Sequence, residues 1–279
     1  PNVSSSRVVT VTAATLTGAS ANNYAWDTSS VQTGNGTIVQ LPSATWVGGA
    51  STNWNDGANW AVTGNLSQTG VLPNLGNVAL AIIPNGSTVV ANAATGYTGK
   101  IELAGTLRVA NDSYLGATPG SVTADLITID GGTLNATDSF TMAVNRGITL
   151  TSNGATFQVD ATKSLNYEGV ILGTGGLTKS GSGTMVVSGA NSYTTTTVAA
   201  GTLQVGNGGT SGSLGTGDVN VTGTLAFNRT DPVTLTYAIA GTGGLTQLGS
   251  NTLTFTGAHT YTGGTNTGAV GSQLVYVNN

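Results

Sequence analysis

The chain has 279 residues, with 43 Gly, no Cys and one His, and its charge is carried by 7 Lys and Arg and 11 Asp and Glu. A net charge of −4 with so few basic residues excludes neutralisation of a nucleic-acid backbone, and the lack of Cys excludes a thiolate zinc site. No apolar run approaches the roughly 18 residues of a membrane-spanning helix. Good helix formers are scarce and Gly and Thr are abundant, so the sequence predicts an all-β protein.

Residues 1–45 are predicted to be an N-terminal strand and extension segment. One alternating run spans residues 37–41, and a Gly-, Ser- and Asn-rich stretch separates it from an earlier run. The segment that begins at Pro1 is polar and lacks the features of a signal peptide, so we expect a mature, processed chain. The earlier run, a candidate strand for pairing with another subunit, consists of Arg7, Val8, Val9, Thr10, Val11 and Thr12.

Tryptophan is confined to the N-terminal part of the chain and does not occur after Trp60. A repeat protein must cover the open end of its first coil, and Trp supplies a large apolar area for that purpose. We therefore predict a Trp-rich cap over residues 46–83. The alternative is a platform on which sugar rings stack. The residues concerned are Trp26, Trp46, Trp54 and Trp60.

A short pattern, Thr-apolar-any-apolar, recurs through residues 84–279. Its alternation is that of a strand with one buried face. The copies follow one another at a mean spacing of about 23 residues, which lies in the range of repeat folds. We therefore predict a parallel β-solenoid of about 23 residues per coil, with Gly pairs such as Gly131-Gly132 and Gly175-Gly176 at its corners. The first apolar positions are Val89, Leu107, Leu134, Phe157, Met185, Leu203, Leu225, Leu253 and Leu274.

Two longer segments, 173–193 and 241–261, align with each other without gaps. The first begins Gly-Thr-Gly-Gly-Leu-Thr-Lys and closely resembles the autotransporter-associated β-strand repeat of secreted bacterial surface proteins and autotransporter passengers. Residues 45–60, with Trp46-Val47-Gly48-Gly49, are similar to the segment that often opens the repeat region in such proteins. The resemblance implies a parallel β-helix and an extracellular, cell-surface location. It implies no activity, because the repeat is a scaffold.

Acidic residues between 112 and 138 allow an enzymatic alternative. With coils of about 23 residues, Asp112 and Asp138 would stack, and so would Arg108 and Asp130. Paired carboxylates in a groove, with Arg146 nearby in sequence, would suit a polysaccharide hydrolase or lyase on a β-helix. The other reading is that these Asp residues bond turn amides at coil corners.

The end of the chain predicts an assembly surface. A strand-like run closes the sequence without a capping helix, a Pro or a charge after it. An uncovered strand edge pairs with another chain, and a head-to-tail contact that does not close gives a filament. The alternative is a fragment of a longer rod. The run consists of Gln273, Leu274, Val275, Tyr276 and Val277.

The function that these features predict is structural. We expect a non-catalytic, secreted β-solenoid subunit that joins copies of itself end to end into a cell-surface filament, with no cofactor and no metal. The first alternative is a monomeric surface adhesin or passenger that binds glycans or a host surface. The second is the polysaccharide lyase or hydrolase.

Overall fold

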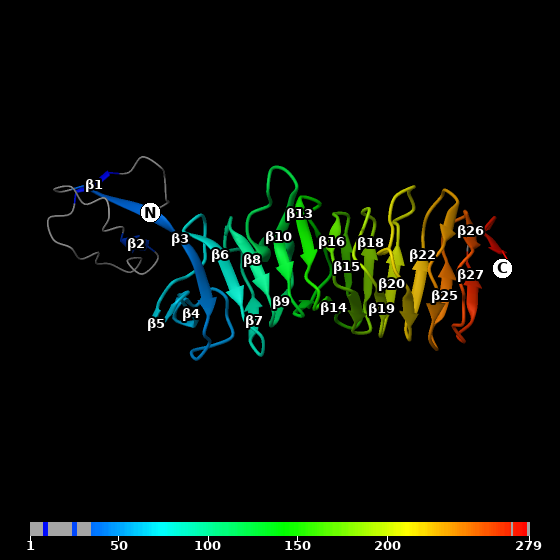
Figure 1. The fold of residues 1–279 in the computed structure, drawn as a ribbon, viewed down its shortest axis with the longest axis horizontal. Helices are drawn as coiled ribbons and strands as arrows, with labels where there is room; N and C mark the ends of the chain where they lie inside the picture. Colours follow the sequence, from blue (N-terminus) through cyan, green and yellow to red (C-terminus); the bar gives the residue numbers. More distant parts are fainter. Residues whose placement is uncertain (1–7, 11–23, 27–34, 269, 278–279) are drawn as a thin grey trace.

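The computed structural model describes residues 8–10, 24–26, 35–268 and 270–277. Its strands lie across a long rod and follow one another along the axis from the N-terminal to the C-terminal end (Figure 1). The helices of the described part are two short 3-10 turns, Gly57–Asn59 and Asp112–Leu115. From β6 onward the strands pair in parallel with strands of the neighbouring coils. The all-β class and the parallel β-solenoid are therefore confirmed.

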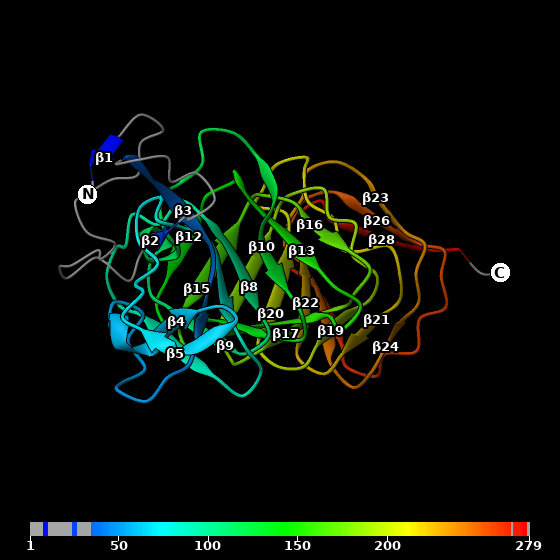
Figure 2. The same cartoon turned by 60° about the vertical axis from the view of Figure 1, so that its left-hand side comes forward.

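The coils stack into three faces, which the chain visits in a constant order, and Figure 2 shows the rod more nearly end-on. The first face holds β3 (Asn35–Trp46), β6 (Val78–Ile83), β8 (Lys100–Leu103), β10 (Thr123–Ile129), β13 (Arg146–Leu150) and β16 (Ile171–Gly173). The second holds β7 (Thr88–Ala91), β9 (Thr106–Val109), β11 (Thr133–Ala136), β14 (Ala155–Val159), β17 (Leu177–Ser180), β19 (Thr196–Val198), β21 (Val219–Val221) and β24 (Ile239–Ala240). The third holds β12 (Phe140–Met142), β15 (Ser164–Tyr167), β18 (Thr184–Val187), β20 (Thr202–Val205), β22 (Thr224–Phe227), β25 (Gly244–Gln247) and β27 (Thr265–Thr267).

A separate sheet completes the last coils. It takes the place of the first face in the chain order, after segments of the preceding coils that form no strand there. We call it the final sheet. It consists of β23 (Val233–Leu235), β26 (Thr252–Phe255) and β28 (Gln273–Tyr276).

One apolar core fills the rod because inward side chains of successive coils stack in register. Leu107, Leu134 and Phe157 pair in this way on the second face, and all three are fully buried. Each such side chain contributes on the order of 1.5–3 kcal/mol on burial. The core therefore runs along the axis as rows of stacked side chains.

The repeated pattern does not stay on one face, which corrects the simple stacking expected from the sequence. The copies from Val89 to Phe157 stack on the second face, but Phe157 pairs with Lys179 and not with Met185. Met185 lies instead on the third face, and Leu253 lies in the final sheet. Where successive copies of the pattern change face, the distance between them is one coil plus one side of the next. The mean spacing of the pattern therefore overestimates the coil, which averages about 21 residues rather than about 23.

The N-terminal end of the rod is filled by aromatic rings. Trp46, Trp54 and Trp60 are at most 4% exposed, and Trp60 meets the other two edge-on, with ring centroids 5.2 and 4.7 Å away. Buried rings offer no face to a sugar, so a stacking platform on these three residues is wrong. Their role as a cap stays a prediction. The backbone of Trp26 lies in β2 (Tyr24–Trp26), and its side chain lies outside the described residues.

Further short strands border this end. β4 (Trp60–Val62) and β5 (Asn65–Thr69) extend the first face in antiparallel orientation. β1 (Val8–Thr10) and β2 pair antiparallel with β3. The boundaries 1–45, 46–83 and 84–279 stay predictions, although β3 and β6 already belong to the first face.

Glycine pairs at the corners allow close approach between coils, as expected. A Cβ atom on Gly175 would lie 1.9 Å from the carbonyl oxygen of Thr151, one coil below. Gly131 has a φ of +76°, which side chains disfavour. These corners therefore require Gly for two different reasons, one steric and one conformational.

Candidate functional site

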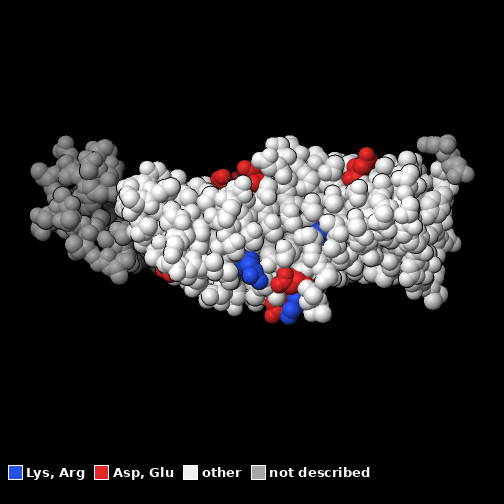
Figure 3. All heavy atoms as spheres, turned by 90° about the horizontal axis from the view of Figure 1, so that it is seen from below, with Lys and Arg blue, Asp and Glu red and all other residues white. Residues whose placement is uncertain are grey.

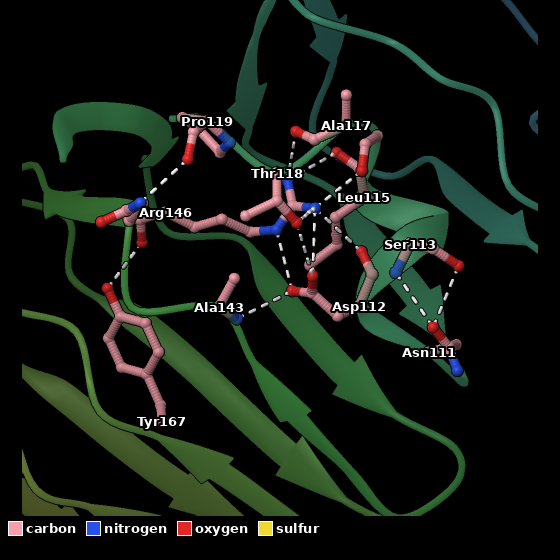
Figure 4. Close-up of polar contacts among 12 residues, drawn as sticks. Asn111, Asp112, Ser113, Leu115, Ala117, Thr118, Pro119, Ala143, Arg146 and Tyr167 are labelled. Atoms are coloured by element: carbon pink, nitrogen blue, oxygen red, sulfur yellow. Dashed lines mark hydrogen bonds and ion pairs between the residues drawn. The ribbon is translucent and has the colours of Figure 1, made fainter. Parts of the chain in front are cut away.

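The most elaborate polar cluster of the rod surrounds Arg146 at the start of β13 (Figure 4). Its guanidinium is fully buried and pairs with Asp112, with Nε 2.8 Å from Oδ1 and Nη2 3.2 Å from Oδ2. The same group donates to four backbone carbonyls and to one hydroxyl. These acceptors are the carbonyls of Asp112, Leu115, Gly116 and Ala117, at 2.7–3.3 Å, and Oγ1 of Thr118, at 3.5 Å.

This cluster fixes a loop, residues 110–122, that widens one coil. Asp112 Oδ1 also accepts from the backbone N–H of Ala143 at 3.0 Å, and the Asn145 amide donates to the carbonyl of Pro119 at 2.9 Å. The Tyr167 hydroxyl donates to the carbonyl of Arg146 at 2.6 Å. Because every N–H group of the guanidinium faces a protein acceptor, Arg146 has no donor left for a substrate. Its role is structural.

The candidate catalytic carboxylates are divided between two corners. Asp112 and Asp138 follow β9 and β11, paired strands of the second face, and so lie at the same corner of successive coils as predicted, but the predicted stacking of Asp130 on Arg108 is wrong. Asp130 lies between β10 and β11, whereas Asp138 lies between β11 and β12, at another corner. Arg108 pairs in register with Asn135, not with Asp130, and its Nε donates to the Asn135 Oδ1 at 3.2 Å. Coils of unequal length shift the register, so a single fixed coil length misplaces these side chains.

Each of these carboxylates is instead held by local partners. Asp130 accepts from the Thr151 hydroxyl and from the Asn153 amide, and these hydrogen bonds, Thr151 first, lower its pKa. Asp138 pairs with Lys163 at 2.8 Å and accepts from the N–H of Ser139, and these contacts lower its pKa. A general acid needs a raised pKa, so neither carboxylate has the environment of one. Asp138 thus bonds a turn amide, as the corner reading expects, whereas Asp130 bonds side chains of the next coil.

A buried lysine was not expected from the sequence. Lys179 points inward from β17, and its Nζ donates to the carbonyls of Ser180, Gly181 and Ala200 at 2.7, 2.8 and 3.1 Å. Burial lowers the pKa of Lys179 to about 8. Its place two residues after the inward Leu177 is the signal that could have revealed it.

The aligned residue in the second long segment, Gln247, is also fully buried but less well satisfied. Its Nε2 donates to the side-chain oxygen of Asn251 at 3.2 Å and also to the carbonyl of that residue. Its Oε1 has no hydrogen-bond partner. The same inward position thus tolerates a cation or an amide, provided that carbonyl oxygens are within reach.

Other classes of site find no support in the described part of the chain. No group of three or more His, Asp or Glu side chains there could hold a metal ion. None of the described helices has the length and apolar character needed to cross a membrane.

The predicted assembly residues lie at the two ends of the described structure. Val8, Val9 and Thr10 form β1 and pair with residues 35–37 of β3, while Arg7, Val11 and Thr12 lie outside the described residues. Within the described chain β28 pairs only with β26, and Leu274 packs partly against the core. The exposed side chains there include Gln273, Val275, Tyr276 and Val277, the last three at 40%, 52% and 48%. Their role in assembly stays a prediction.

Comparison with known proteins identifies the two long similar segments. Residues 177–205 and 245–266 match the model of the passenger-associated-transport-repeat family. These two segments are similar to passenger-associated-transport repeats. The resemblance to autotransporter-associated repeats is therefore confirmed.

A known autotransporter adhesin is similar to this chain over a longer stretch than the two repeats. Over 162 residues the chain is 40% identical to a protein named adhesin BmaC autotransporter, from Brucella suis biovar 1 (strain 1330). The aligned part covers 57% of this chain and 4% of that adhesin. No solved structure matches the chain significantly.

The two passenger-associated-transport repeats occupy different sides of the rod. The first begins in β17 on the second face and ends in β20 on the third, and the second begins in β25 on the third face, passes through β26 in the final sheet and ends in β27. Equivalent residues of the two repeats are thus three coils and one face of the rod apart along the chain. What the copies share is the inward alternation and the glycine corner. They do not line up into one common surface.

Proposed function

We propose that this chain is a rod segment of a secreted bacterial surface adhesin, of the autotransporter-passenger type. The observation that carries the proposal is the coincidence of an uninterrupted parallel solenoid with two passenger-associated-transport repeats and the similarity to an autotransporter adhesin. A solenoid with a continuous core is a stiff spacer, and its faces present long, regular surfaces to a partner. Both properties suit a protein that acts outside the cell.

We further propose that the segment is not catalytic. Asp130 lies at a different corner from Asp112 and Asp138, and each of the three carboxylates is bound to a local partner. The two repeats share their inward apolar positions, Leu177 and Met185 in the first and Leu245 and Leu253 in the second, which supports a scaffold role. Neutral and charged polysaccharides incubated with the chain should therefore show no release of reducing ends or unsaturated products. Activity that disappears in Asp130→Ala would contradict this.

The adhesive role is tested with the purified, fluorescently labelled chain. We expect saturable binding to intact bacterial or host-cell surfaces, which unlabelled chain displaces. A labelled β-solenoid of unrelated sequence is the control for nonspecific retention. Binding no stronger than that of the control on every surface would overturn the proposal.

End-to-end assembly is a second candidate, favoured by the exposed strand β28. Val275, Tyr276 and Val277 leave apolar area exposed beside a strand edge that has no partner among the described residues, and such an edge accepts an added strand. Negative-stain images across a concentration series should then show filaments, and deletion of residues 1–12 should leave only single rods. Filaments of normal length from the truncated chain would contradict a contact between subunits that uses residues 1–12.

A further inference from the structure

A column of threonines runs along the outer side of the second face. Its members hold the same register position in successive coils, because each pairs directly with the next. Neighbouring strands in a sheet lie about 4.8 Å apart, so the hydroxyl groups repeat at about that interval along the rod. The column consists of Thr88, Thr106, Thr133, Thr156, Thr178 and Thr197.

The hydroxyl groups of this column are free to bind. Among the described residues, none of these hydroxyls has a hydrogen-bond partner. Other outward threonines return their hydroxyl to the backbone, as Thr137 does to Val109 at 3.2 Å and Thr149 to Ala124 at 3.1 Å. The side chains of the column are exposed or half-buried, so a ligand can reach them.

A shallow groove of about 200 Å³ follows the column at the corner between the first and second faces. Thr156, Thr178 and Thr197 line one side, and backbone at Gly154 and Gly176 forms part of the wall. A Cβ atom on Gly176 would lie 2.4 Å from the Thr195 hydroxyl oxygen, and Gly154 has a φ of +73°. The fold therefore keeps side chains out of this wall, and the groove stays open.

One end of the groove carries an oriented polar side chain. Asn153 lines the groove, and its Nδ2 donates to Asp130 Oδ1 at 2.7 Å. This bond uses one of the two N–H donors of Asn153 and orients the amide, which leaves the second N–H and the amide oxygen for a ligand. Asp130, once a candidate acid, thus becomes a positioning residue for the groove.

The surface beside the groove is polar but uncharged. From β14 to β24 the outward positions of the second face hold no charged side chain. The charged residues at the corners of this stretch are Asp160, Lys163 and Asp218, and Lys163 is paired with Asp138 at 2.8 Å. Figure 3 looks onto this side of the rod and shows charge gathered in a few small groups, with wide uncharged areas between them. From β14 to β24 the cation at the corners, Lys163, is already paired, and the outward Arg108 lies on β9, outside this stretch, so an anionic polymer would find no unpaired cation here.

We propose that the Thr column and this groove, together the threonine strip, bind an uncharged polysaccharide that lies along the rod. Each hydroxyl donates and accepts, as sugar hydroxyls do, so every coil can contact the same extended chain. One such contact is weak, but contacts repeated along one polymer act together at high effective concentration. This inference rests on the proposed adhesive function and names the surface and the class of ligand.

The test measures binding of the full chain to immobilised uncharged polysaccharides, a glucan and a galactomannan, with alginate and heparin as charged comparisons. The variant T156V/T178V removes two hydroxyls and keeps the shape of both side chains. Its matched control, T184V/T202V, makes the same change on adjacent coils of the third face, outside the groove. T156S/T178S keeps the hydroxyls and tests rescue.

We expect saturable binding to an uncharged polysaccharide, weakened about tenfold in T156V/T178V, since two net hydrogen bonds are lost, and changed less than about twofold in T184V/T202V. The serine variant should bind as the unchanged chain does. Equal binding by both valine variants, or binding to the charged polymers alone, would overturn the proposal that the threonine strip binds an uncharged polysaccharide. If cell surfaces still bind the chain in that case, the adhesive function survives. If the unchanged chain binds no polysaccharide and no cell surface, both the threonine strip and the adhesive function are contradicted.

Discussion

Replacing Arg146 with Ala should destabilise the rod at one coil and release the loop 110–122. The substitution removes a buried guanidinium that pairs with Asp112 and satisfies carbonyls of residues 112–117. Leu115 and Gly116 are buried, so their carbonyls cannot simply turn to water without moving the loop. The loop must either open or keep unpaired acceptors.

The expected loss follows from the burial of the two partners. Breaking a buried ion pair by removing one partner costs about 3–5 kcal/mol. Asp112 is 19% exposed and can regain water, whereas the arginine side chain is 1% exposed. We therefore expect a loss near the lower end of that range, about 3 kcal/mol. R146K keeps the charge but loses the planar fork of donors, so its loss should be intermediate.

Urea denaturation measures the free energy of unfolding of each variant. Hydrogen exchange of residues 111–122 shows whether the loss of stability lies in the loop. The control is K163A, which removes the ion pair of Lys163 with Asp138, whose side chains are 36% and 57% exposed. Exposed pairs stabilise little, so this variant should denature as the unchanged chain does. A loss below about 1 kcal/mol in R146A, with unchanged exchange in the loop, would refute the reasoning.

Two further perturbations test the core and the corners. Burial lowers the pKa of Lys179 to about 8, so between that value and its ordinary pKa near 10.5 the unfolded chain binds more protons, and stability should rise from pH 8 toward 10 by at most about 1.4 kcal/mol per pH unit. Burial raises the pKa of Tyr193 to about 12, so above about pH 10 the unfolded chain loses protons first and stability should fall. Urea titrations of K179M should lack the rise, and a rise that persists would assign it elsewhere. G175A should destabilise the rod, because its Cβ would meet a carbonyl 1.9 Å away, whereas G264A, with nothing within 4 Å, should not; equal melting temperatures would contradict the corner argument.

The sequence carried enough information for the solenoid because its strongest signal is local. Thr106-Leu107 and Thr133-Leu134 repeat the same alternation, and stacking them buries the same inward positions. The face on which a copy lies is not a local property. Phe157 and Met185 have equivalent neighbours in sequence, yet they belong to different faces. The chain between them completes one coil and then one further side of the rod.

The polar sites were harder to foresee for the same physical reason. Arg146 meets Asp112 only because a loop of one coil folds over the next, and a fixed coil length could not place that contact. The same assumption misassigned Asp130 as a stacking partner of Arg108. The Thr column could be read from the sequence as strand propensity alone, and its free hydroxyls and the groove beside Thr178 became visible only with the three faces in place.

Attachment by cells that display the chain tests the central claim most directly. The chain would be displayed on a bacterium that does not adhere, and attached cells would be counted under flow on host-cell and polysaccharide surfaces. The account predicts attachment well above that of the same strain without the chain, and its loss when soluble chain is added as a competitor. Attachment equal to that of the strain without the chain on every surface would contradict the account.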